Sequence, residues 1–279
     1  MKIQQLPNDI FTDNTEGILL YDYRINNACL KNKIVLTKNV FSFLVEGNKE
    51  LVTHDQTVTI ENDKFIFIKS GNCLMSENLS PSNQYRSILL FFSDELVSNF
   101  CRKHEINLSN TANNNPYQIC DYDSYIANFL DSLKQIINYK PALQQQLLLP
   151  KFEEIMLYLI HKKGKKFIED FAIYQNDYNK QFNDVIENNK LNHLSIQELA
   201  FLCNMSVSTF KRTFEKNYKT SPIRWFQEKR LERSAFLLSN KKIRPIDLYD
   251  EIGYESLSSF TQAFKGKFGT TPKQFQLQN

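Results

Sequence analysis

The sequence has few cysteines, and their arrangement argues against two kinds of site. There are five, an odd number spread singly along 279 residues without a CxxC pair: Cys29, Cys73, Cys101, Cys120 and Cys203. A disulfide framework needs paired cysteines, and a structural zinc site needs clustered ones. Free thiols are typical of a reducing compartment. We therefore expect neither a disulfide framework nor a structural zinc site.

Histidine is also scarce, which bears on enzymatic function. The four histidines, His54, His104, His161 and His193, are scattered singly, whereas a catalytic metal centre needs histidines grouped with a carboxylate. The sequence lacks a GxSxG motif, a glycine-rich phosphate loop and a DxD-type cation loop. The His54–Asp55 pair is more typical of a surface turn than of acid–base catalysis. The sequence thus predicts no catalytic residue, no metal ligand, no cofactor and no enzymatic activity.

Long apolar runs are absent as well. No stretch of 18 apolar residues occurs, so a membrane span is not expected. The first residues, Met1 to Asp9, lack the apolar segment of a signal peptide. Together with the free thiols, these features predict a cytoplasmic protein without a membrane partner.

Basic residues are concentrated in the C-terminal third of the chain. Residues 181–279 contain 15 Lys and Arg against 10 Asp and Glu, a net charge of +5, in a chain whose net charge is +3. Residues 1–180 therefore carry a net charge of −2. This asymmetry is expected of a protein with a nucleic-acid partner, and an ordinary solvated surface can produce the same excess.

Short apolar stretches separated by turn residues predict β-strands in the first part of the chain. Residues 40–45 are apolar except for Ser42, residues 46–49 form a turn cluster, and residues 56–60 alternate between polar and apolar. Closely spaced short strands favour a small antiparallel β-barrel or sandwich, which we place at about residues 1–105.

Two amphipathic helices are predicted to follow, at about residues 122–161. Apolar residues recur at helical spacing from Tyr125 to Tyr139 and from Leu147 to His161, and Pro141 interrupts the pattern. These helices can pack on the strands or on a second copy of the chain, so a homodimer is one expectation. Residues 162–180 are predicted to be a linker. Their lysine run is more typical of a solvated face than of a DNA-binding arm.

The C-terminal part repeats itself at an offset of 50 residues. The matched positions are Ser206 and Ser256, Ser208 and Ser258, Phe210 and Phe260, Phe214 and Phe264, Tyr218 and Phe268, Trp225 and Phe275, and Thr220-Ser221-Pro222 and Thr270-Thr271-Pro272. An internal period in this range indicates duplicated structural units.

Each repeat has the pattern of two helices joined by a tight turn. In the first, Ser195 and Glu198 form a capping box, Asn204 lies in the turn, and Ser206 caps the second helix. Asn tolerates the positive φ of such a turn better than most residues.

In the second repeat, Leu248 and Ile252 belong to the first helix, Gly253 lies in the turn, and Ser256 caps the second helix. One long helix, from Ile223 to Leu238, is predicted between the repeats. Six aromatic residues are expected to be core rather than stacking platforms for single strands: Phe210, Phe214, Phe260, Phe264, Trp225 and Phe275.

Several further runs occur in a fixed order in this part of the chain. They include Phe210-Lys211-Arg212-Thr213-Phe214, Ser221-Pro222-Ile223-Arg224-Trp225, Ile252-Gly253-Tyr254-Glu255-Ser256 and Phe268-Gly269-Thr270-Thr271-Pro272. Over about residues 180–276 the sequence resembles the AraC/XylS family of bacterial regulators. The resemblance implies a transcription regulator in which the second helix of each unit enters a major groove of double-stranded DNA, with RNA polymerase as a further partner. One departure is Asn204, where the family often has Gly.

Matching by position gives candidate DNA contacts. The candidates for base contact are Ser208, Lys211, Arg212, Ser258, Ser259, Thr261 and Gln262, and those for phosphate contact are Ser206, Thr209, Lys216, Arg230, Ser256 and Lys265. Lys and Arg suit guanine, Gln suits adenine, and helix N-termini offer N–H groups to phosphates. Outward Ser, Lys and Arg also occur on any amphipathic helix. The base-contact candidates of the second unit are uncharged, which favours positioning over sequence readout.

The family usually pairs this domain with a sensor that is often a cupin-like barrel, and the strand-rich residues fit that architecture. Residues 244–249 resemble the branch that includes the type III secretion activators, whose barrel domain binds protein partners and self-associates. The resemblance leaves open whether the effector is a small molecule or a protein.

The predicted fold is α+β, with a small antiparallel cupin-like barrel and following helices in residues 1–161. After the linker, residues 181–279 form an all-α domain of two helix-turn-helix units joined by a long helix. Two functions fit this architecture. One is a DNA-binding regulator, an activator whose N-terminal domain senses an effector or partner and dimerises. The alternative is a protein-interaction module whose barrel binds another protein while DNA contact is secondary. The charge asymmetry and the repeat favour the first.

Overall fold

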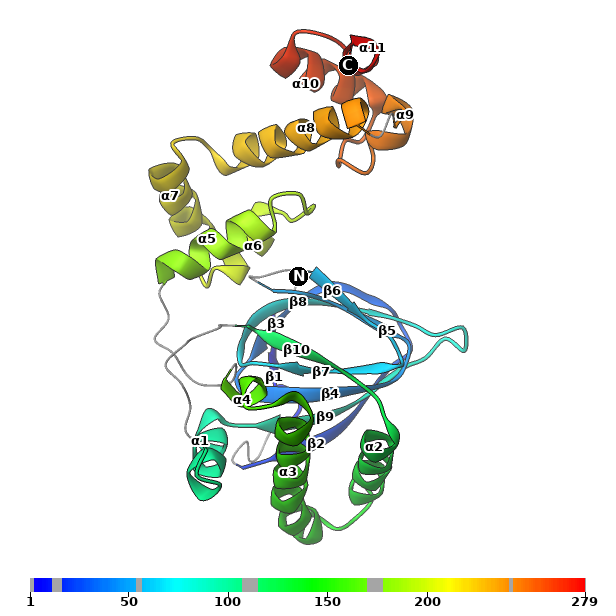
Figure 1. Ribbon diagram of the computed structural model, residues 1–279, viewed down its shortest axis with the longest axis vertical. Coiled ribbons are helices and arrows are strands. Elements are labelled where there is room, and N and C mark those ends of the chain that lie inside the picture. Colours follow the sequence, from blue (N-terminus) through cyan, green and yellow to red (C-terminus); the bar gives the residue numbers. More distant parts are fainter. Residues whose placement is uncertain are drawn as a thin grey trace. The chain divides into compact units, whose positions relative to one another are not determined.

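The computed structural model describes residues 3–11, 17–53, 57–106, 115–169, 178–240 and 243–278. It divides into two compact units, Met1–Gln181 and Phe182–Asn279, whose elements are labelled in Figure 1. The first unit combines sheets with helices and the second is helical, which confirms the predicted α+β class. The His54–Asp55 pair lies outside the described residues.

Within the described residues, the first unit contains two five-stranded sheets. The first sheet has the spatial order β1 (Ile3–Leu6), β3 (Cys29–Leu36), β8 (Gly71–Asn78), β5 (Asn48–Val52) and β6 (Thr57–Ile60). The second has the order β10 (Tyr117–Asp121), β7 (Lys64–Ile68), β4 (Asn39–Glu46), β9 (Tyr85–Phe92) and β2 (Leu19–Ile25). Strand β1 pairs with β3 in parallel, and the other neighbouring strands are antiparallel.

Apolar side chains, rather than a continuous ladder of hydrogen bonds, join the two sheets. Leu36 and Leu51 of the first sheet share one buried cluster with Ile66 and Phe91 of the second. Two layers held in this way need no pairing between their edges. In the part of the chain that the structure describes, the sheets remain separate ladders with β1, β6, β10 and β2 at their edges. The two packed sheets therefore match the sandwich that the strand pattern allowed and not the barrel, and the parallel β1–β3 pair departs from the predicted antiparallel arrangement.

The second sheet is buried on both faces. Along β4, Val40 and Leu44 belong to the cluster between the sheets, whereas Phe41 and Phe43 belong to a second cluster that includes the helices. A strand covered on both sides has little reason to alternate between polar and apolar residues. This explains why five of the six residues 40–45 are apolar, Ser42 being the exception.

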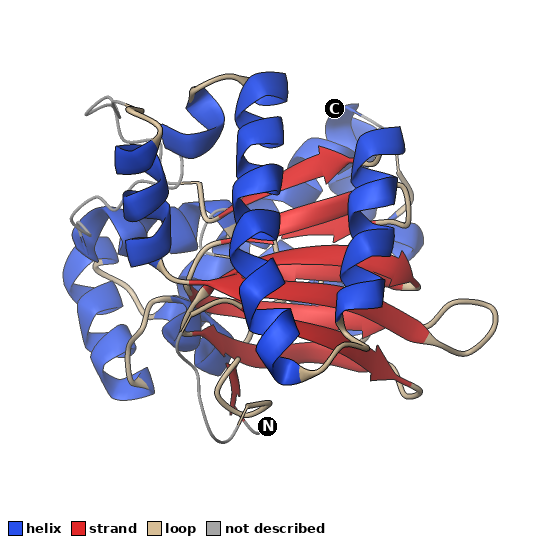
Figure 2. Ribbon diagram, turned by 90° about the horizontal axis from the view of Figure 1, so that it is seen from below, coloured by secondary structure: helices blue, strands red, loops and turns tan. Residues whose placement is uncertain are grey.

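Helices cover the outer face of this second sheet. The described residues of the first unit form α1 (Asp94–Lys103), α2 (Ser124–Ile136), α3 (Pro141–Lys163) and α4 (Lys166–Glu169). Figure 2 shows α2 and α3 lying across the sheet. The ring centroids of Phe92 and Phe152 are 4.8 Å apart, and those of Phe43 and Phe129 are 5.7 Å apart. The two helices predicted over about residues 122–161 are thus confirmed, and they pack on the sheet.

Two details of these helices differ from the sequence pattern. Helix α3 begins at Pro141, earlier than predicted, because proline suits the first helical position, where the N–H has no partner within the helix. Helix α4 lies inside the segment assigned to a linker. Its Phe167 and Ile168 are buried in the same cluster as the apolar side chains of α2 and α3.

A small polar cluster lies between the two sheets. The Nζ of buried Lys49 donates to Ser42 Oγ at 2.9 Å, and Tyr23 donates to Glu77 at 2.9 Å. Burial lowers the pKa of Lys49, an effect that the nearby Glu77 opposes. The adjoining cavity has a volume of about 20 Å³, enough for about one water molecule. As described, this space is too small for an organic effector.

Asp123 connects the start of α2 to the end of α3. Its carboxylate accepts hydrogen bonds from Tyr158, Lys162 and the N–H of Ile126. Desolvation alone would raise the pKa of Asp123, but the hydrogen bonds from Lys162 and Tyr158 outweigh it and lower the pKa to about 2. The folded state therefore favours the ionised form of Asp123 more strongly than the unfolded chain does.

We expect this stabilisation to be fully present above pH 3.8, the ordinary pKa of Asp, and to be lost as the pH falls through about 2. Asp123→Asn keeps a good N-cap and removes the charge. Urea unfolding of both proteins between pH 5 and pH 2 measures the difference. The variant should be less stable at pH 5, and the two should converge toward pH 2. A difference that does not depend on pH would contradict the role of the carboxylate.

Helices make up the second unit. In the described residues these are α5 (Tyr178–Asn188), α6 (Ile196–Leu202), α7 (Val207–Tyr218), α8 (Pro222–Asn240), α9 (Pro245–Leu248), α10 (Leu257–Phe268) and α11 (Pro272–Gln278). Among the helices of the described ranges, none combines the length and apolar character needed to cross a bilayer.

Candidate nucleic-acid interface

Helices α6 and α7 form the first helix-turn-helix unit. Ser195 and Glu198 make the predicted capping box, with Ser195 N–H donating to the Glu198 carboxylate at 2.7 Å. Asn204 lies in the turn with φ of +55°, the left-handed conformation expected there. Ser206 then caps α7 by accepting from the N–H of Thr209 at 3.2 Å. The local sequence signals therefore fix both ends of the turn.

The second unit follows the same plan with a shorter first helix. Regular helix α9 ends at Leu248, not at Ile252 as predicted, and turns continue the chain with Ile252 still buried. Gly253 has φ of +81°, and Ser256 caps α10 by accepting from the N–H of Ser259 at 3.2 Å. Helices α7 and α10 thus occupy equivalent positions in the two units.

Aromatic side chains anchor both helices, as the repeat predicted. Phe210 and Phe214 on α7 and Phe260 and Phe264 on α10 are fully buried. Trp225 is buried too, and Phe275 is half-buried against Phe264 with ring centroids 5.3 Å apart. These rings are core, and this confirms the interpretation that set them apart from stacking platforms.

Helix α8 belongs to two apolar cores. Near its start, Trp225 and Phe226 pack against Phe214, with ring centroids 5.7 and 5.8 Å away. Further along, Leu231 and Leu238 belong to the core of the second unit. The two helix-turn-helix units are therefore built on opposite parts of one helix.

The candidates for base contact lie on the outer faces of α7 and α10. Six are exposed and Thr261 is half-buried; the exposed ones are Ser208, Lys211, Arg212, Ser258, Ser259 and Gln262. The helical periodicity explains this placement, because the aromatic stripe faces inward and leaves these positions outward. The base-contact candidates on α7 include two cations, Lys211 and Arg212, whereas those on α10 are uncharged.

Most candidates for phosphate contact are also accessible. Ser206, Lys216, Ser256 and Lys265 are exposed, and Thr209 is half-buried in the first turn of α7. The first turn of a helix leaves backbone N–H groups unpaired and concentrates positive charge, which suits a phosphate.

Arg230 on α8 is placed differently. Arg230 is half-buried, and its Nε has no hydrogen-bond partner among the described residues. Burial lowers the pKa of Arg230, and the opposing effect of Tyr254 is smaller. Among the six candidates, its side chain is the least favourably placed for a phosphate.

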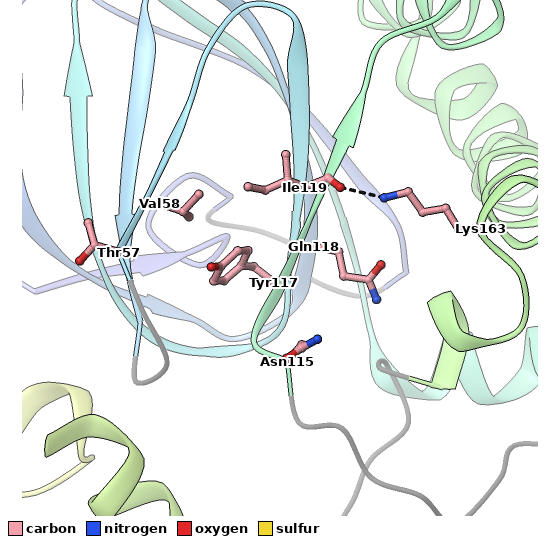
Figure 3. Close-up of a pocket in the computed structure, with 7 residues that line it drawn as sticks. All are labelled: Thr57, Val58, Asn115, Tyr117, Gln118, Ile119 and Lys163. Atoms are coloured by element: carbon pink, nitrogen blue, oxygen red, sulfur yellow. Dashed lines mark hydrogen bonds between the residues drawn. The ribbon is translucent and has the colours of Figure 1, made fainter. Parts of the chain in front are cut away.

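The first unit of the chain also has an open hollow, shown in Figure 3. Its volume is about 360 Å³, and it is lined by Thr57, Val58, Asn115, Tyr117, Gln118, Ile119 and Lys163. Lys163 Nζ donates to the carbonyl oxygen of Ile119 at 2.7 Å, as the dashed line marks. The lysine thereby occupies a backbone acceptor of edge strand β10, a common protection of sheet edges.

Both compact parts of the chain, Met1–Gln181 and Phe182–Asn279, contain a segment that matches a known protein family. Residues 39–171 match the ExsA N-terminal regulatory domain family, and residues 199–278 match a helix-turn-helix domain family. The thermoregulatory protein LcrF of Yersinia pestis is 25% identical over 84% of this chain and 87% of its own length. The transcriptional regulator ExsA of Pseudomonas aeruginosa is 23% identical over 92% of this chain and 88% of its own.

Among solved structures, ToxT of Vibrio cholerae with a bound unsaturated fatty acid is similar to this chain. The alignment covers 96% of this chain and 97% of that one, with 14% identity and a TM-score of 0.42.

Two helix-turn-helix units on a shared helix, following a regulatory domain in the sequence, define a DNA-binding transcription regulator. The chain belongs to the AraC family, in the branch that contains ExsA and LcrF.

Proposed function

We propose that this regulator activates transcription by placing α7 and α10 in successive major grooves on one face of duplex DNA. The observation that carries the proposal is the equivalence of the two helices. Each follows a left-handed turn residue, each begins at a capping serine, and each buries two phenylalanines while its polar face is exposed. The relatives include a virulence regulon transcriptional activator of Yersinia enterocolitica, which supports activation.

In this proposal the two helices contribute unequally. Lys211 and Arg212 read base edges together with Ser208, because a cationic donor can reach guanine in the major groove. On α10, Ser258, Ser259, Thr261 and Gln262 make weaker or positioning contacts. Phosphates are held by Ser206, Thr209, Lys216, Ser256 and Lys265, with a smaller part for Arg230.

The N-terminal unit receives the signal in the cytoplasm and forms the contacts of a homodimer. RNA polymerase is engaged by the chain once it is bound to DNA. The cavity of about 20 Å³ between its sheets has no room for an organic effector. This supports a partner protein, or a molecule bound at the surface, as the signal. We propose that residues 181–279 form the DNA-binding domain, as predicted. The N-terminal domain extends past residue 161, because Phe167 and Ile168 of α4 are buried in its apolar cluster, so any linker is shorter than the predicted 162–180.

A titration of duplex DNA at several salt concentrations tests this function. The probe is the DNA upstream of the chain's own gene. The logarithm of the binding constant should fall linearly with the logarithm of salt concentration, with a slope of about −0.9 per neutralised phosphate. Weak binding that hardly depends on salt, together with capture of a partner by the N-terminal unit, would favour the protein-interaction alternative.

A further inference from the structure

A direct contact joins the first helix-turn-helix unit to the turn of the second. The Nε2 of His193, in the loop before α6, lies 3.0 Å from the carbonyl oxygen of Glu251. Because a carbonyl only accepts, this ring nitrogen donates. The ring also lies on Gly253, since a Cβ there would be 2.1 Å from His193 Nδ1. We call His193, Glu251 and Gly253 the inter-unit contact.

The loop that carries His193 has a defined conformation. Asn189 is fully buried, and its Nδ2 donates to the carbonyl of Val185 at 2.9 Å. Asn192 Nδ2 donates to Asn189 Oδ1 at 2.9 Å, and Ser195 caps α6 three residues further on. The histidine is thus presented between two anchored points of the first unit.

The turn on the other side is anchored as well. Gln227 on α8 donates from Nε2 to the hydroxyl of Tyr254 at 3.2 Å, and the Tyr254 ring lies 5.5 Å from that of Phe260 on α10. The backbone that His193 touches is therefore tied both to the connecting helix and to the second DNA-facing helix.

A single connecting helix fixes the distance between two bodies better than their rotation. Helix α8 has 19 residues, which corresponds to a length of about 28 Å, and a helix of this length can curve gently. A second attachment away from its axis restrains bending and twisting. The inter-unit contact provides such an attachment.

We propose that the inter-unit contact sets the placement of α10 relative to α7, and with it the spacing of the two DNA segments that the regulator reads. This inference rests on the proposed function. His193 acts as a positioning residue because it restricts the arrangement before DNA is bound, which reduces the entropy lost on binding.

The experiment uses the full chain and a duplex selected by it from random DNA, with the two protected segments located by footprinting. Binding is then measured to that duplex and to versions with two base pairs inserted or removed between the segments. For the wild type, both changes should weaken binding strongly. His193→Ala should weaken binding to the selected duplex about threefold, the worth of one exposed hydrogen bond, and should lose less on the altered duplexes. Leu191→Ala, an exposed residue of the same loop, is the control and should behave as wild type.

Gly253→Asn provides a second test. Asn is tolerated at positive φ, as Asn204 shows in the equivalent turn at +55°, but its Cβ would displace His193. We expect it to reduce the spacing penalty as His193→Ala does. The double variant should be no worse than either single variant, because both remove the same contact.

The outcomes separate the two hypotheses. If no duplex is selected by the wild type, the proposed function fails. If the wild type binds and the spacing penalty is absent from it, or unchanged in His193→Ala and Gly253→Asn, the inference fails while the proposed function stands. A loss of stability alone would weaken binding to the three duplexes equally, which also overturns the inference.

Discussion

Phe214→Ala is expected to lower the free energy of unfolding of the helical C-terminal part, Phe182–Asn279, by about 3–5 kcal/mol, the largest stability effect that we expect. The ring is fully buried. Its neighbours are five other rings, with centroids between 4.5 and 6.3 Å away: Phe182, Phe210, Tyr218, Trp225 and Phe226. Removing it leaves a cavity where two helices and the start of α8 meet, and such packing relaxes only in part.

The fluorescence of Trp225 measures this change, because it is the one tryptophan of the chain and touches Phe214. Urea unfolding followed at this residue therefore reports on the unit concerned. Lys216→Ala, an exposed change on the same helix, is the matched control and should shift the midpoint little. An unaltered midpoint in Phe214→Ala would show that the ring does not hold the unit together.

Arg212→Ala is expected to cost about 1–3 kcal/mol in DNA binding, roughly a 5- to 150-fold rise in Kd, and to relax base preference at one position of the site. Arg212 is exposed on α7. Its planar fork can donate twice to guanine, and alanine removes both donors. Affinities for a set of duplexes with single base substitutions measure the effect.

Lys216→Ala provides the comparison for this prediction, since it also removes one cation from α7. As a phosphate contact it should weaken binding to every duplex by the same factor and reduce the salt slope by about 1. If Arg212→Ala shows this uniform pattern, its side chain holds a phosphate. If affinity and base preference are both unchanged, it has no part in binding.

Much of the structure of the helical part, Phe182–Asn279, follows from local signals in the sequence. A capping serine, a residue that tolerates positive φ and two phenylalanines four positions apart each act within one helix or turn. Their repetition at an offset of 50 residues adds a second reading of the same pattern. Some N-terminal strands, such as β4 and β7, were also predictable individually, because short apolar runs and turn residues are local features. Strand β10 was not, since it lies beyond the region of about residues 1–105 to which the strands were assigned.

The arrangement of those strands was not predictable in the same way. Closure of a sheet into a barrel depends on which edge strands meet, and the residues of β1 and β6 do not specify this. Nor does the sequence of β1 specify that this strand pairs in parallel with β3. The end of α9 at Leu248 also depends on packing, since Ile252 stays buried outside the regular helix.

The contact between His193 and Gly253 was missed for a related reason. The two residues are 60 positions apart, and a single exposed histidine carries no periodic signal. The different turn residues were the one available hint. Asn204 is exposed and can keep a side chain, whereas the space beside Gly253 is occupied by the histidine ring.

Because α8 supplies side chains to both apolar cores, unfolding of the whole helix would expose apolar surface in both. We therefore expect the two helix-turn-helix units to unfold and fold together. If both helices hold the same duplex, unfolding of α8 would release both sets of contacts together.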